Sequence, residues 1–129
     1  MKSATILTVT SLLSILFCTF HLADDVVRGF EPGGVNNIVG VLVLVVWLFG
    51  TLGLNGRRSG YLIMLLGSLL GSIVPVVHMR GAGLVGGRLA NSTGIFFFVW
   101  TLLALGGSAG LSVILSARAL WQLPWRRRP

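Results

Sequence analysis

The chain has 129 residues, of which 54% are hydrophobic and only 10% are charged. A soluble domain carries about 25% charged residues, so this composition excludes a soluble fold and indicates an integral membrane protein whose first partner is the lipid bilayer. The net charge of +7 comes largely from basic residues at the ends of apolar runs, which argues against binding to nucleic acid.

The first apolar run covers about residues 4–23 and follows Lys2. About 20 residues are enough to cross the hydrocarbon core, so we expect a retained spanning helix rather than a cleaved signal peptide. On this helix Thr10, Ser14 and Cys18 form a polar line among apolar side chains. Cys18 is the single cysteine, so no intramolecular disulfide can form.

The polar line continues into residues 20–31, which hold all three acidic residues and one of the two histidines. At about 100° per residue, the side chains at positions 21, 24, 25 and 28 fall within an arc of roughly 100°. With the second histidine they form the candidate polar site: His21, Asp24, Asp25, Arg28, Glu31 and His78.

The second apolar run, about 35–54, follows a turn rich in glycine, and Asn36 or Asn37 is expected to cap it. Its length favours a spanning helix over a strand. The third run, about 60–79, is also long enough to span. It contains Pro75, which should kink the helix.

The fourth run, about 93–120, is the longest, and Asn91, Ser92 or Thr93 should cap it. The glycine-rich connection before it contains Gly-x-Gly-x-x-Gly at 81–86. A nucleotide-binding loop of this type requires a preceding strand, and here a spanning helix precedes it, so the match is accidental.

Four spans with short connections predict one all-α membrane domain over 1–129, folded as an antiparallel four-helix transmembrane bundle. One side carries seven basic residues, namely Lys2, Arg57, Arg58, Arg118, Arg126, Arg127 and Arg128, and the other carries three, Arg28, Arg80 and Arg88. The basic side should be cytoplasmic, which places both termini inside. Tyr61, Trp121 and Trp125 then fall at the cytoplasmic interface. The small size is typical of a bacterial cytoplasmic membrane protein.

Lipid provides no hydrophobic driving force between helices, so association depends on small residues and interhelical hydrogen bonds. Small residues recur at four-residue spacing on the third and fourth runs: Gly67, Gly71, Ala104, Gly106, Ser108, Gly110 and Ser112. These rows serve either packing within the bundle or contact with a second copy or a larger membrane partner.

The first and third spans both run outward, so His21 and His78 should end at the same surface. With Asp25 they could supply nitrogen and oxygen ligands to a divalent metal. The alternative is a charge network in which Arg28 pairs with Asp24 or Asp25 at the helix end. The residues contain no nucleophile–base pair, and no motif predicts an organic cofactor.

In size and number of spans the chain resembles small multidrug exporters. That family carries an acidic residue in the middle of its first span, whereas residues 4–20 contain none, so its activity is not extended to this chain. The leading hypothesis is a non-enzymatic accessory subunit that acts through helix packing. The alternatives are a periplasm-facing component that binds or transports a cation or proton, and a metal-dependent membrane hydrolase.

Overall fold

The computed structural model describes residues 2–31, 33–35, 37–80 and 93–123, and the regular structure in these ranges is entirely helical. The helices are α1 Lys2–Val27, α2 Asn37–Leu52, α3 Arg58–Arg80 and α4 Ile95–Gln122. This confirms the all-α prediction. Three of them, α1, α3 and α4, are long and apolar enough to cross a membrane. At 16 residues, α2 is shorter than the expected run of 35–54 and measures about 24 Å at 1.5 Å per residue.

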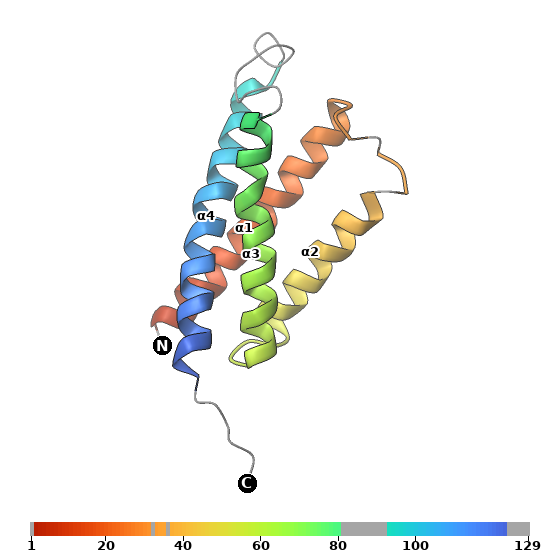
Figure 1. The fold of residues 1–129 in the computed structure, drawn as a ribbon. Coiled ribbons are helices and arrows are strands. Elements are labelled where there is room, and N and C mark those ends of the chain that lie inside the picture. The colour runs from red at the N-terminus through yellow and green to blue at the C-terminus, as the bar shows by residue number, and fades with distance from the viewer. Residues whose placement is uncertain (1, 32, 36, 81–92, 124–129) are drawn as a thin grey trace.

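Each helix runs in the direction opposite to the one before it, and α2 is tilted relative to α3 and α4 (Figure 1). The most extensive contacts join α4 to α3 and to α1, whereas α2 packs mainly on α3. The closely packed pairs are therefore α3 with α4 and α1 with α4. Helix α2 is less closely packed, and a cavity lies between it, α1 and α3.

Buried hydroxyl groups join the closely packed helices. Ser68 of α3 donates a hydrogen bond to Ser112 of α4 over 2.8 Å, and Ser14 of α1 donates to Ser108 of α4 over 3.1 Å. Of these four residues Ser14, Ser68 and Ser112 are fully buried. In lipid such bonds are among the few forces that hold helices together. The serines at four-residue spacing on α4 therefore pack inside the protein.

Helix α2 is attached mainly through Trp47, whose side chain is only 2% exposed. Its indole Nε1 donates to Ser11 Oγ of α1 over 2.9 Å, and the same serine bonds to Thr51 over 2.8 Å. Gly67 of α3 faces the indole so closely that a Cβ atom there would overlap the ring. Because Gly67 has no side chain, the ring of Trp47 can pack directly against the backbone of α3.

The glycines of α4 differ in what they face. A Cβ atom at Gly106 would lie 2.9 Å from Pro75 Cγ, so this glycine admits the proline of α3. Gly71 of α3 lies close to Ala109 in the same way. A Cβ atom at Gly110 would meet nothing within 4 Å. Gly106 therefore serves internal packing, whereas Gly110 leaves a small notch on the outside of α4.

The start of α4 differs from the prediction. Gly94 is the N-cap, with a φ of 77° and no side-chain hydrogen bond, so Thr93 does not cap the helix as expected. Glycine adopts a left-handed backbone conformation at little cost in free energy, which allows the turn at Gly94 that precedes α4. Asn91 and Ser92, like the glycine motif at 81–86, lie outside the described residues.

Two further expectations are tested only in part. Asn37 begins α2, but its buried Oδ1 has no hydrogen-bond partner among the described residues, so its side chain does not act as a cap; Asn36 lies outside them. Tyr61 packs in a buried cluster with Leu7 and Met64. Trp121 is 91% exposed, and Trp125 lies outside the described residues.

Candidate functional site

The end of α1 is shaped by a glycine turn. Gly29, with a φ of 75°, donates from its backbone N–H to the Val26 carbonyl over 3.1 Å, and Phe30 donates to the Asp25 carbonyl over 2.9 Å. These two bonds form a Schellman motif, which stops the helix and satisfies its last carbonyl groups. The motif keeps Asp25 within the last turn of α1 and one turn above His21.

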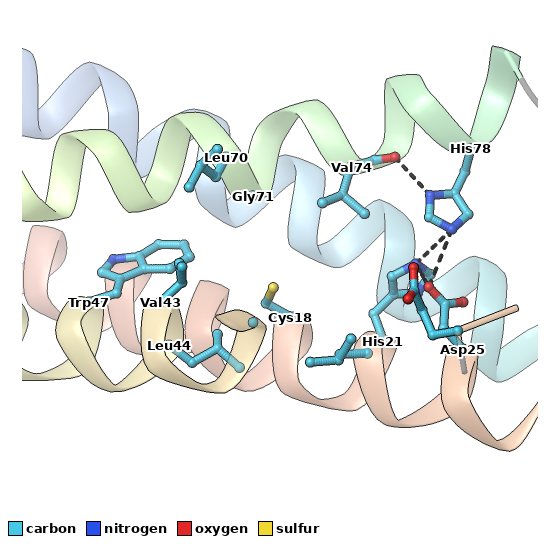
Figure 2. Close-up of a pocket in the computed structure, with 13 residues that line it drawn as sticks. Cys18, His21, Asp25, Val43, Leu44, Trp47, Leu70, Gly71, Val74 and His78 are labelled. Atoms are coloured by element: carbon cyan, nitrogen blue, oxygen red, sulfur yellow. Dashed lines mark hydrogen bonds and ion pairs between the residues drawn. The ribbon is translucent and has the colours of Figure 1, made fainter. Parts of the chain in front are cut away.

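Helices α1 and α3 bring the two histidines together. The ring centroids of His21 and His78 lie 4.6 Å apart, and their Nε2 atoms lie 3.2 Å apart, although 57 positions separate the residues in the chain. Figure 2 shows both rings at the same end of the two helices. The sequence predicts that both histidines reach one surface, and the structure places them in direct contact.

Asp25 completes the cluster. Its Oδ2 atom lies 3.5 Å from His21 Nε2 and 3.5 Å from His78 Nε2 (Figure 2). The residues His21 and Asp25 are only 3% and 7% exposed, while His78 is partly exposed. The triad His21–Asp25–His78 thus directs two nitrogen atoms and one oxygen atom at a single point near the end of the helices.

The orientation of His78 is set by its own helix. Its Nδ1 atom lies 2.9 Å from the Val74 carbonyl oxygen, which can only accept, so Nδ1 carries the hydrogen and donates it. In the neutral ring Nε2 then has a free lone pair, directed at His21 and Asp25. Histidines that bind metals are oriented in the same way, by donating the other ring N–H to a carbonyl or carboxylate.

Two buried polar atoms of the triad have no partner among the described residues. They are His21 Nδ1 and Asp25 Oδ1. Buried polar atoms in native proteins nearly always have a hydrogen-bond partner, and leaving one without costs about 1–3 kcal/mol. Neither atom is one of the three that meet at the shared point, so the contacts within the triad leave His21 Nδ1 and Asp25 Oδ1 without a partner among the described residues.

Phe98 of α4 forms an apolar wall beside the triad. It is fully buried, and its ring centroid lies 5.0 Å from that of His21 and 5.7 Å from that of His78. The sequence analysis missed this residue, because a phenylalanine within an unbroken apolar run carries no signal of its own. Its ring shields one side of the imidazoles and lowers the local dielectric.

The other acidic groups have separate roles. Asp24 pairs with Arg28, whose Nε lies 2.7 Å from the carboxylate. The same guanidinium donates to the Thr93 carbonyl over 3.1 Å and lies over the ring of Phe98, so it links the end of α1 to the start of α4. The charge pair that the sequence suggested therefore exists for Asp24, whereas Asp25 faces the histidines. Glu31 is exposed and lines the cavity beside the triad.

His21, Asp25 and His78 also form the single group of three metal-ligating side chains close enough to share an ion within the described part of the chain. Two of these residues come from one face of α1, one turn apart, and the third comes from α3. The site is therefore assembled by helix packing and not by a local motif. The chain matches no protein-family model, and comparisons with curated proteins and with solved structures find no match either.

Proposed function

We propose that this protein binds one transition-metal ion, preferably zinc, through His21 Nε2, Asp25 Oδ2 and His78 Nε2. The spacing of the three atoms carries the proposal, with separations of 3.2, 3.5 and 3.5 Å. A tetrahedral zinc ion with bonds of about 2.0–2.1 Å separates its ligand atoms by about 3.3 Å. An ion could therefore enter with little movement of the side chains.

The donor types favour the same group of metals. Imidazole nitrogen with carboxylate oxygen suits zinc and its neighbours, whereas magnesium and calcium prefer oxygen ligands alone. Three protein ligands leave the fourth tetrahedral position open, as in catalytic zinc sites and unlike structural ones. The site is therefore suited to binding or activating a further ligand at the metal.

We also infer that the chain forms an antiparallel four-helix bundle in the bacterial cytoplasmic membrane, with both termini in the cytoplasm. The excess of basic residues at one end of the helices supports this orientation. Helix α2 is short, but exposed apolar side chains such as Val39, Val45 and Leu52 cover its length. Local thinning of the bilayer can accommodate a helix of this size. The triad then faces the periplasm.

Metal analysis of the purified protein tests the proposal. We expect about one zinc ion per chain after dialysis against zinc. The substitutions His21→Ala, Asp25→Asn and His78→Ala should each weaken zinc binding at least about 100-fold, because the loss of a second-shell partner alone costs 10–100-fold. Isothermal titration in lipid nanodiscs measures the affinities.

Asp24→Asn is the matched control, since it changes the same group one position away on the same helix. Asp24 pairs with Arg28, so zinc binding should stay within about threefold of wild type. Visible spectra of the cobalt-substituted protein would report tetrahedral coordination. Wild-type protein without stoichiometric metal, or Asp25→Asn protein that binds zinc as wild type does, would contradict the proposal.

A second candidate function is assembly with another copy of the chain or with a larger membrane partner. The observation that favours it is the notch at Gly110, next to exposed apolar side chains of α4 such as Leu103, Leu111 and Ile114. Small residues on a lipid-facing helix let a second helix approach closely. This would make the protein an accessory subunit whose metal site faces the periplasm.

A pair of leucine substitutions separates internal packing from assembly. Gly110→Leu should reduce oligomers at least about tenfold without loss of stability, because its side chain would project outward. Gly106→Leu should instead destabilise the monomer by about 1–3 kcal/mol, because it would collide with Pro75. Crosslinking in native membranes and unfolding in detergent measure the two effects. Unchanged crosslinking of Gly110→Leu would remove this face as an interface.

A further inference from the structure

A cavity of about 290 Å³ adjoins the triad and lies between α1, α2 and α3. All three triad residues line one end of it, together with Glu31. From there the cavity extends along the helices toward Trp47, with Cys18 between the two ends (Figure 2). Its volume lies near the lower limit for ligand pockets in proteins, about 300–1,000 Å³.

Most of the cavity wall is apolar. It is formed by Leu22 of α1, by Val43 and Leu44 of α2, and by Leu70 and Val74 of α3. The far end is closed by the ring of Trp47, whose polar Nε1 is bonded to Ser11 and therefore presents no free donor to the cavity. A polar ligand would find no hydrogen-bond partners on these walls, whereas a hydrocarbon chain could pack against them.

The cavity is therefore amphipathic, with its polar groups confined to the end at the triad. An ion held by His21, Asp25 and His78 would carry two positive charges, against one negative charge on its ligand Asp25. The carboxylate of Glu31 lines the same end of the cavity but is exposed and is not one of the proposed ligands. The fourth coordination position would then attract an anionic oxygen. The walls and the ion together select a ligand that has an apolar chain and an anionic head group.

We infer that this cavity binds a single-chain amphiphile with an anionic oxygen head group, such as a carboxylate or a phosphate, whose oxygen occupies the open position of the metal. This rests on the proposed metal site, which supplies the positive charge. The chain lies along α2 and α3 toward Trp47. The cavity is partly open at its side, so such molecules could enter it from lipid, the phase in which they dissolve.

Cys18 provides a direct test because it is the only cysteine and lines the middle of the cavity. The zinc-loaded protein in nanodiscs is treated with N-ethylmaleimide, with and without decanoate, decyl phosphate or decanol. We expect decanoate or decyl phosphate to slow the alkylation of Cys18 at least about tenfold. Decanol has the same chain but no anionic head group, and it should slow alkylation less than about threefold. The better of the two anions identifies the head group.

Two variants separate this inference from the proposed metal site. Val43→Phe should fill the cavity and abolish protection while zinc still binds, whereas Val45→Phe, on the exposed side of the same helix, should leave protection intact. In Asp25→Asn the protection by decanoate should fall to the level of decanol.

Zinc binding without protection by either anion would overturn the inference and leave the metal site standing. Equal protection by decanol and decanoate would overturn the role of the head group. Failure of zinc binding in the wild type would overturn both proposals. The wild-type comparison of decanoate with decanol needs no variant, so it decides the matter even if Val43→Phe does not fold.

Discussion

Zinc at about 100 times its dissociation constant should raise the free energy of unfolding of the wild-type protein by about 2.7 kcal/mol, and His78→Ala should lose this gain. The reason is linkage: a ligand that binds only the folded state stabilises that state. His78 and Asp25 come from different helices, so the ion would join the C-terminal end of α3 to the C-terminal end of α1. Unfolding in detergent, with zinc and with a chelator, measures the difference.

The same measurement distinguishes a metal site from a simple charge network. If His21, Asp25 and His78 only pair with one another, zinc should change the stability of neither the wild type nor the His78→Ala protein. The substitution should then lower the free energy of unfolding by the same amount with zinc and with a chelator. The control is Asp24→Asn, which should retain the full gain from zinc, because Asp24 pairs with Arg28. A zinc effect of the same size in His78→Ala would contradict the assigned ligands.

Much of this site could be predicted from the sequence. His21 and His78 end two spans that run in the same direction, so they had to reach one surface. The helical arc at positions 21–28 also placed the acidic groups with them. Helical periodicity could not decide which of two adjacent aspartates faces α3. That depends on how α1 is rotated in the packed structure, and the structure directs Asp25 to the histidines and Asp24 to Arg28.

The apolar runs predicted the four helices, but they left the packing of α2 undetermined. A run of nearly unbroken valine and leucine shows no periodicity that would mark its buried face. The one informative feature was Trp47, since tryptophan favours the membrane interface and this one lies in the middle of the run. Trp47 lies away from the interface because it is buried against Gly67 of α3. Its ring also lines the far end of the cavity between α1, α2 and α3.

The contacts of Trp47 with Gly67 and Ser11 also determine how strongly α2 is attached to the other helices. Ser11 bonds to both Trp47 and Thr51, so one hydroxyl of α1 contacts two residues of α2. Loss of the indole N–H alone would leave the Ser11–Thr51 bond in place. A hydrogen bond between membrane helices contributes about 0.6 kcal/mol on average. The packing of the ring against Gly67 should therefore matter more than its hydrogen bond.

Trp47→Ala should lower the free energy of unfolding by about 2 kcal/mol and release α2 from the other helices. The same truncation in a soluble core costs about 3–5 kcal/mol, and the cost is smaller here because lipid already solvates the exposed ring in the unfolded state. Trp47→Phe keeps most of the ring and should cost about 0.6 kcal/mol. Hydrogen exchange of α2 amides in nanodiscs measures the release. Equal losses for Ala and Phe would show that the hydrogen bond, and not the packing against Gly67, holds α2.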